Sequence, residues 1–212
     1  MKLIERGVLS AVMILSCASL GIAQTPGQAP AGRQGGRGGP PRVVLSVTTS
    51  AWPDGGEVPM TYSMRGDNKS PAFDFHWSIG NNPTDPPADL KSYVMTLRDM
   101  ENSTNKGPTD TLHWAAFNIP GTAKGVPMGL AGGDLPDGTR NGPGFNAGRG
   151  GTPSYAGPGA GPGPFHHYCF EFYALDTKLD LPATVSREDL LKAMEGHVIG
   201  KAVYYGRFHS AQ

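Results

Sequence analysis

Apolar and polar residues alternate over short stretches of this chain, a pattern that predicts β-strands. In the stretch 92–99, Tyr93, Met95 and Leu97 fall on one face, because successive side chains of a strand point to opposite sides of the sheet. Similar stretches, separated by loops rich in Gly, Pro, Asn and Asp, lie at 43–48, 58–62, 73–77, 113–119, 168–175 and 202–208. The pattern therefore favours a protein built from short strands joined by turns.

One helix is expected near the C-terminal end of the chain. Ser186 and Asp189 have the spacing of a capping box, in which two side chains satisfy the free N–H groups of the first helical turn. Apolar residues from Leu190 to Met194 then follow at helical spacing. Many strands and one late helix predict a mainly β protein, an antiparallel β-sandwich of two sheets with a few peripheral helices.

Three of the predicted strands carry polar groups at one end of an otherwise apolar face. Asp99 ends the face of the strand 92–99, His113 begins the next strand, and His166 and Tyr168 begin a later one. If neighbouring strands run antiparallel, the end of one lies beside the start of the next. We therefore expect these four side chains to converge at one mouth of the sandwich core, as in a ligand pocket with apolar walls.

The chemistry of the expected cluster suits a small anion such as a phosphoryl group. Asp99 is assigned as the orienting group and charge partner of the imidazoles, because a nearby carboxylate favours the protonated form. His113 and His166 are then hydrogen-bond donors to the anion, and Tyr168 is a hydroxyl donor stacked over the entrance. Backbone N–H groups of the Gly-rich stretch 157–161 would complete the anion site.

Two other kinds of chemistry are less well supported by the sequence. A metal site would draw on Asp99, Glu101, His113 and His166, but no helical His-x-x-x-His pair exists and His167 faces away from His166. No metal and no cofactor are therefore predicted.

Catalysis also lacks a candidate nucleophile. A Gly-x-Ser-x-Gly elbow is missing from the sequence, and Cys169 faces away from His166 on the same strand. No catalytic residue is assigned, and a hydrolase that uses His113 or His166 as general base with Asp99 is retained as the alternative function.

Composition indicates an exported single-domain protein. Residues 1–23 read as a secretory signal peptide, 24–41 as a Gly/Pro-rich flexible linker, and 42–212 as one domain with a Gly/Pro-rich loop insertion at 132–164. A lipoprotein signal, with Cys17 as the acylated first residue, is the alternative. Cleavage after Ala23 removes Cys17 and leaves only Cys169, so no internal disulfide can form. The expected location is the periplasm or the cell exterior.

Charge excludes some partners. The 18 basic and 18 acidic residues balance, which gives no basic surface for a nucleic acid. The apolar run of the signal is too short for a transmembrane helix, so no transmembrane span is expected.

The order of several motifs resembles the phosphatidylethanolamine-binding protein (PEBP) family, in particular its bacterial Raf-kinase-inhibitor-like branch. The matching stretches are Ser70-Pro71 with Trp77, Lys91-Ser92-Tyr93, Asp99-Met100-Glu101, His113-Trp114 through Pro120, Gly157-Pro158, His166-His167-Tyr168 and Tyr173-Ala174-Leu175-Asp176. The resemblance implies a β-sandwich that binds phosphoryl or other small anionic groups. It carries the ligand-binding role to Asp99, Glu101, His113, His166 and Tyr168, with Gly157 and Pro158 on the approach to the pocket.

The chain departs from the family pattern at the rim of the expected pocket. Met100 stands where the family motif has proline, Glu101 where it has aspartate, and His167 where it has a permanently charged arginine. Anion affinity is therefore expected to be weaker or more pH-dependent than in the family, and phosphatidylethanolamine itself is not assumed as ligand.

Together these features predict an exported binding protein for a small phosphoryl-type anion or phospholipid headgroup, acting as a monomer or homodimer. An inhibitor or modulator of an envelope protein is a further interpretation, with the segment 132–164 as the contact surface.

Overall fold

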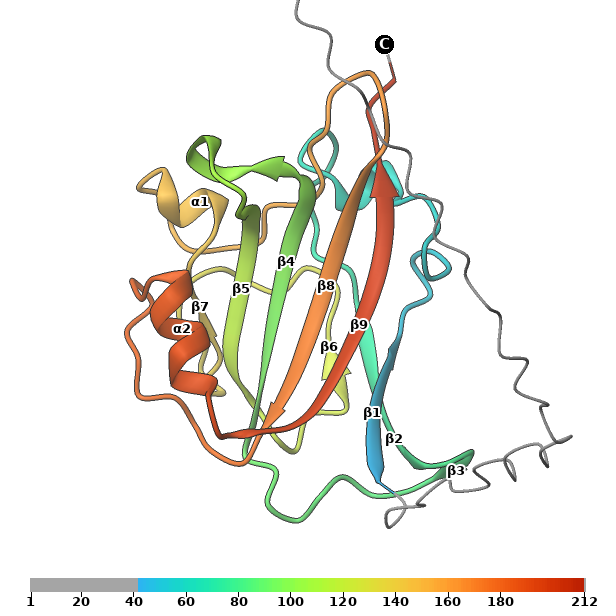
Figure 1. Ribbon diagram of the computed structural model, residues 1–212, viewed down its shortest axis with the longest axis vertical. Coiled ribbons are helices and arrows are strands. Elements are labelled where there is room, and N and C mark those ends of the chain that lie inside the picture. Colours follow the sequence, from blue (N-terminus) through green and yellow to red (C-terminus); the bar gives the residue numbers. More distant parts are fainter. Residues whose placement is uncertain (1–41, 212) are drawn as a thin grey trace, which may run out of the picture. The chain divides into compact units, whose positions relative to one another are not determined.

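The computed structural model describes residues 42–211, which form two antiparallel sheets packed face to face (Figure 1). The expected signal peptide and linker lie outside the described residues. The larger sheet has the order β7-β5-β4-β8-β9, and the smaller has the order β1-β2-β3 with β6 paired to β2. The strands are β1 (Val43–Thr48), β2 (Phe73–Ile79), β3 (Asn82–Pro83), β4 (Ser92–Ser103), β5 (Asp110–Pro120), β6 (Gly125–Val126), β7 (Arg140–Asn141), β8 (His166–Leu175) and β9 (Val198–Phe208). The predicted mainly β sandwich is confirmed.

The main core lies between the two sheets and is strongly aromatic. Phe73 and Phe75 of β2 face the larger sheet, where Phe73 packs 4.8 Å from Phe172 of β8 and Phe75 packs 4.4 Å from Tyr93 of β4, measured between ring centroids. Aromatic pairs in tilted or edge-to-face contact add to the free energy gained from burying their area. These contacts hold β4 and β8 in the middle of the protein.

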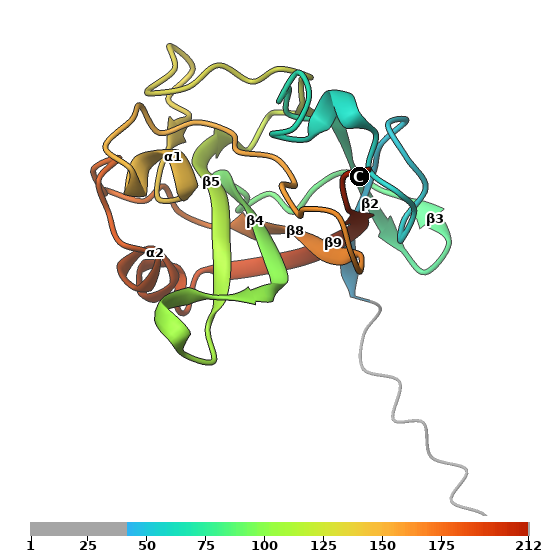
Figure 2. The same ribbon diagram turned by 90° about the horizontal axis from the view of Figure 1, so that it is seen from above.

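The outer face of the larger sheet is also partly buried, which the alternating pattern of 92–99 did not predict. Helix α2 (Arg187–Met194) lies across it, and its Leu190 and Met194 join Val94 and Phe117 in a second core. Figure 2 shows α2 and the short helix α1 (Phe145–Gly148) on the side of the sheet where β5 lies. Both faces of β4 are therefore buried along most of its length.

The start of α2 agrees with the predicted capping box. The backbone N–H of Asp189 donates to the hydroxyl of Ser186, at 3.0 Å, and that hydroxyl donates to the Asp189 carboxylate at 2.7 Å. The first turn of the helix thus gains a partner for one of its free N–H groups.

One predicted strand is wrong. The stretch 58–62 forms a turn of 3-10 helix, η1 (Met60–Tyr62), instead of a strand. Pro59 has no N–H with which to pair in a sheet, and the carbonyl of Pro59 accepts from the N–H of Tyr62. A second 3-10 turn, η2 (Thr104–Lys106), connects β4 to β5.

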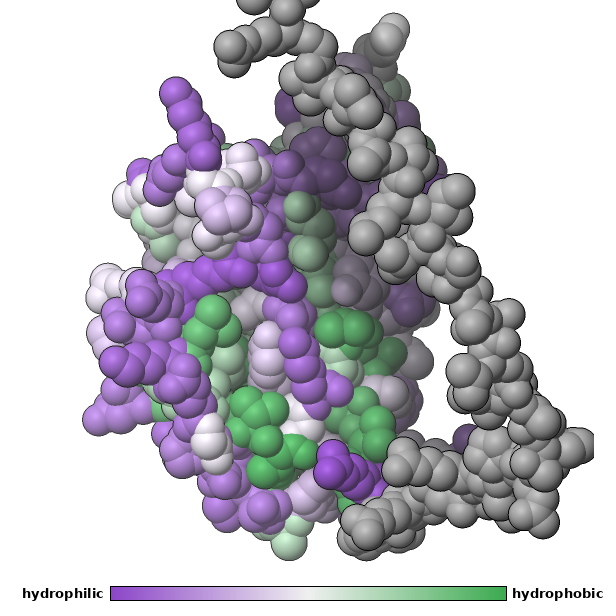
Figure 3. All heavy atoms as spheres, viewed as in Figure 1, coloured by the Kyte–Doolittle hydropathy of each residue, from purple (hydrophilic) through white to green (hydrophobic). Residues whose placement is uncertain are grey.

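Part of the outer face remains open beside α2, where Figure 3 shows hydrophobic side chains gathered. Leu191 of α2 and Val198 and Val203 of β9 are 40–44% exposed. Within residues 42–211, the structure contains no helix with the length and hydrophobicity of a membrane span.

Candidate anion-binding site

Asp99 occupies the end of the central strand β4, and the sheet register brings the other predicted site residues to it. Asp99 pairs with Tyr168 at the start of β8 and with Thr111 near the start of β5. Both β5 and β8 run antiparallel to β4, the arrangement expected if the polar ends of these strands are to lie together. Four polar residues that are far apart in the sequence, Asp99, His113, His166 and Tyr168, therefore meet at one end of the sandwich.

The Asp99 carboxylate is buried and makes several hydrogen bonds within the protein. Its oxygens lie 2.9 and 3.0 Å from Nδ1 of His166, and Oδ1 accepts the backbone N–H groups of Glu101 and Asn102, each at 3.1 Å. A buried carboxylate is strongly favoured to keep such partners. Because a carboxylate only accepts, Nδ1 of His166 carries the proton, and Nε2 is left for a ligand. The His166 side chain is 32% exposed, so a ligand can reach it.

His113 is held differently, and the donor role expected for it stays a prediction. Its Nδ1 lies 3.2 and 3.0 Å from the carbonyl oxygens of Ala156 and Gly157, so Nδ1 must donate. Burial lowers the pKa of His113, and the nearby Asp99 carboxylate only partly opposes this effect. The ring is therefore neutral near pH 7, and its Nε2, 3.9 Å from Asp99 Oδ2, presents a lone pair. In this form Nε2 can act only as a hydrogen-bond acceptor.

Tyr168 lies beneath the histidines, not over the entrance. Its side chain is fully buried, and its hydroxyl accepts the backbone N–H groups of Gly159 and Ala160 at 3.0 and 3.1 Å. Burial raises the pKa of Tyr168 well above its usual range, and the charge of Asp99 adds to the effect. Tyr168 thus anchors the segment that carries the carbonyl partners of His113.

The Gly-rich approach makes internal contacts. The N–H of Gly157 donates to Asn68 Oδ1 at 2.9 Å, and the carbonyl of Pro158 accepts from the N–H of Met64. A Cβ on residue 157 would lie 2.0 Å from the Tyr62 carbonyl oxygen, so only glycine fits. The N–H groups of Gly157, Gly159 and Ala160 are therefore used within the protein and do not form the expected anion cradle. Direct ligand contacts of Gly157 and Pro158 stay a prediction.

Glu101 lies at the rim, next to His167. Its carboxylate accepts from the backbone N–H and from Nδ1 of His167, at 2.6 and 2.7 Å. One ligand atom each from Asp99, Glu101 and His166 lie within 4.8 Å of one another, a set that could hold a divalent ion. The carboxylates of Asp99 and Glu101 already accept hydrogen bonds within the protein, whereas Nε2 of His166 is left for a ligand.

Phe145 is a residue of the site that the sequence reasoning missed. Its ring stacks on His113 with 5.6 Å between centroids and an interplanar angle of 16°, and the Arg149 guanidinium lies 4.0 Å from its centroid. Phe145 and Tyr155 are the aromatic residues of the segment 132–164. Two aromatic residues in a Gly/Pro-rich segment were the available signal that part of this segment packs against the domain.

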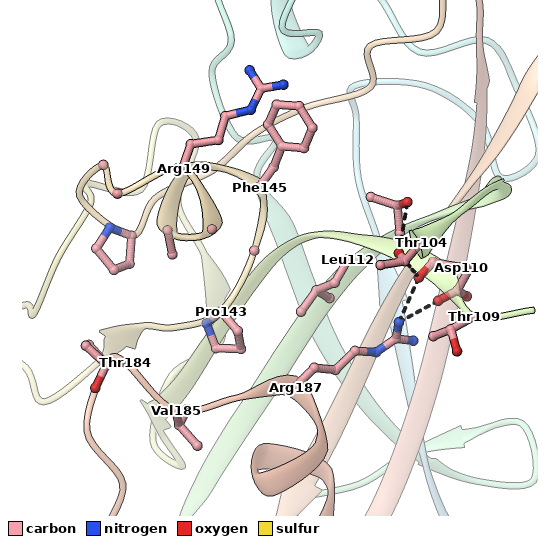
Figure 4. A pocket seen from close by; sticks show the side chains of 18 residues that line it. Thr104, Thr109, Asp110, Leu112, Pro143, Phe145, Arg149, Thr184, Val185 and Arg187 are labelled. Atoms are coloured by element: carbon pink, nitrogen blue, oxygen red, sulfur yellow. Dashed lines mark hydrogen bonds and ion pairs between the residues drawn. The ribbon is translucent and has the colours of Figure 1, made fainter. Parts of the chain in front are cut away.

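A cavity of about 790 Å³ adjoins the site on the side of Phe145 (Figure 4). Phe145 lines it, whereas Asp99, His113, His166 and Tyr168 do not. The cavity and the polar cluster are therefore neighbouring features that share one aromatic side chain.

The two-sheet sandwich and the buried carboxylate between two imidazoles define a β-sandwich protein with a polar site at one end. The family described as phosphatidylethanolamine-binding protein matches residues 48–209. The chain belongs to this family, which confirms the resemblance found in the sequence.

Relatives span the same domain. A UPF0098 protein of Methanothermobacter thermautotrophicus is 37% identical over 77% of this chain and 98% of its own length, and the UPF0098 protein YbhB of Escherichia coli is 30% identical over 69% and 79%. The crystal structure of a PEBP homolog from Chlamydia trachomatis has a TM-score of 0.65 and 26% identity, covering 79% of this chain and 99% of its own. Escherichia coli YbcL, at 24% identity and a TM-score of 0.61, has the same fold.

Proposed function

We propose that this protein binds a small phosphoryl-type anion, with Nε2 of His166 as the principal donor. The observation that carries the proposal is the pair of 2.9 and 3.0 Å contacts between the buried Asp99 carboxylate and Nδ1 of His166. This pairing fixes the ring orientation and compensates the positive charge of the imidazolium form. A protonated His166 then offers Nε2–H to an anion at the surface.

The neutral His113 narrows the ligand class. Its Nε2 lies 3.9 Å from Asp99 Oδ2, and both atoms are hydrogen-bond acceptors when the ring is neutral with its proton on Nδ1. A ligand that also carries a donor satisfies both, as a phosphate hydroxyl or an ammonium group does. Phosphoethanolamine, the headgroup of the lipid for which the family is named, combines an anionic phosphate with such an ammonium.

An envelope location fits this ligand class. Residues 1–23 have the charged start, apolar run and small residues of a secretory signal, and phospholipid headgroups border the envelope compartments. In this setting the protein acts as a headgroup or phosphoryl-ligand binder that modulates an envelope protein. The mass of the exported protein should correspond to a start at Gln24, whereas a lipid-modified start at Cys17 would contradict cleavage after Ala23.

NMR titration of the full exported chain tests the site. Phosphate and phosphoethanolamine should each shift the ring signals of His113 and His166, because both rings border the proposed site. His197 provides a matched control, because its Nδ1 also contacts a carboxylate, Asp176, at 2.7 Å, away from the site. His166→Gln should abolish the shifts and His197→Gln should preserve them. Unmoved His113 and His166 signals at millimolar ligand would refute the proposal.

The second candidate is a hydrolase, favoured by one observation. A carboxylate bonded to Nδ1 leaves Nε2 poised as a general base, the orientation seen in catalytic triads. Cys169 is unsuited as its nucleophile, because burial raises the pKa of this thiol. Phosphate release from p-nitrophenyl phosphate that disappears in His166→Gln would establish catalysis and displace the binding function.

A further inference from the structure

The cavity beside Phe145 is built from three segments that are distant in the sequence. They are the connection between β4 and β5 with the first residues of β5 (104–112), the segment 143–153 that includes α1, and the stretch 183–187 that ends at the first residue of α2. Figure 4 shows Pro143 and Leu112 facing the interior between Phe145 above and Arg187 below. At about 790 Å³, the cavity falls within the range of small-molecule sites.

Its walls are mainly apolar. Leu112, Pro143, Phe145, Ala147 and Val185 are among the apolar side chains that line the space. Apolar surface that stays in contact with water is unfavourable, and a ligand of matching character gains free energy by covering it. The body of a fitting ligand is therefore apolar.

The charged side chains that line the cavity are Asp110, Arg149 and Arg187, so one negative and two positive groups leave a net charge of +1. The Asp110 carboxylate is shared by two guanidinium groups, those of Arg98 and Arg187, and only Arg187 of this pair lines the cavity. Arg187 contacts Asp110 through Nη1 alone, at 2.7 Å to Oδ1 and 3.0 Å to the backbone carbonyl. Within residues 42–211, its other N–H donors make no hydrogen bond. Arg149 adds a second positive charge at the opposite side, over Phe145.

From the apolar walls, the volume and the free donors of Arg187, we infer that this cavity binds an amphipathic monoanion, an apolar body bearing one carboxylate. The carboxylate pairs with Arg187, whose planar guanidinium suits it. The body lies against Leu112, Pro143 and Phe145. This site is separate from the Asp99–His166 cluster and does not depend on its function.

Decanoate and decanol test the inference, because they share one alkyl chain and differ in charge. The full exported chain is loaded with the fluorescent probe 8-anilinonaphthalene-1-sulfonate, and each compound is titrated as a competitor. Decanoate should displace the probe at a concentration roughly tenfold below that of decanol, as expected for one charge-assisted hydrogen-bonded pair. In NMR, decanoate should shift the amide signals of Ala147, Thr184 and Val185 and leave the His166 ring signals unchanged.

Two variants test the charge and the space of the cavity separately. Arg187→Gln should weaken decanoate binding roughly tenfold and leave decanol unaffected, whereas Lys192→Gln removes a charge from an exposed position of the same helix and should change neither. Ala147→Trp should block both compounds by filling the space, and thermal melting verifies that each variant is folded. Equal binding of decanoate and decanol, undiminished decanoate binding by folded Arg187→Gln and Ala147→Trp, or shifts centred on His166 would each overturn the inference.

Discussion

Replacing Tyr168 by phenylalanine tests how the site is held together. The hydroxyl of Tyr168 accepts two backbone N–H groups, those of Gly159 and Ala160, at 3.0 and 3.1 Å, of which the first bond is partly buried and the second is buried. Tyr168→Phe keeps the ring and removes the acceptor of both. A buried donor without a partner costs about 1–3 kcal/mol, so the free energy of unfolding should fall by roughly 2–4 kcal/mol for the pair.

Tyr204→Phe is the matched control for this experiment. The Tyr204 hydroxyl donates to the carbonyl of Trp52 at 2.6 Å, so its removal leaves one acceptor without a bond and no orphaned donor. The expected loss is about 1 kcal/mol. The protein suits this comparison, because Trp52, Trp77 and Trp114 are buried and report unfolding by fluorescence.

Urea denaturation of both variants measures the two losses of stability. An unchanged m-value would show that the two variants expose similar surface on unfolding, so that midpoints can be compared. Tyr168→Phe should also perturb the NMR ring signals of His113, since the segment that it anchors supplies the carbonyls bonded to Nδ1. If Tyr168→Phe costs no more than Tyr204→Phe, the anchoring argument is refuted.

Three further predictions concern stability. Burial lowers the pKa of His113 in the folded state, so the unfolded chain binds more protons than the folded chain below about pH 6.5. The free energy of unfolding should therefore fall as the pH decreases from that value. His113→Gln should make the free energy of unfolding less dependent on pH, as measured by denaturation at several pH values between about 5 and 8. Ser186→Ala removes the cap of α2 and should cost about 1 kcal/mol in urea unfolding, with Ser186→Thr retaining most of the stability. Gly157→Ala places a Cβ 2.0 Å from the Tyr62 carbonyl oxygen and should lower stability by about 3 kcal/mol or more, measured by thermal melting; a melting curve like that of the parent would contradict the close approach.

The sequence predicted much of the fold and the membership of the site. The alternation in 92–99, together with the polar ends of neighbouring strands, was enough to bring Asp99, His113, His166 and Tyr168 together, because strand period and antiparallel pairing dictate which side chains share an end. The grouping of these four side chains followed from their positions in the sequence alone.

The roles of these side chains could not be derived in the same way. Which nitrogen of His113 donates depends on where the carbonyls of Ala156 and Gly157 lie, and these belong to an irregular segment without a periodic pattern. The same holds for Tyr168, whose hydroxyl meets N–H groups of that segment. Strand periodicity predicts which face of a sheet a side chain lies on, whereas the irregular segments decide which of its atoms donate and which accept. The packing of Phe145 onto His113 is another contact made by an irregular segment.

Phe145 links the polar cluster to the neighbouring cavity. One ring face-stacks on His113 and also forms a wall of the neighbouring cavity. Any occupant that displaces this ring changes the surroundings of His113, and thermodynamic linkage makes the effect mutual: a cavity ligand that weakens anion binding by some factor is itself weakened by the anion by the same factor. Phe145 is thus the side chain through which two chemically unlike ligands would sense each other.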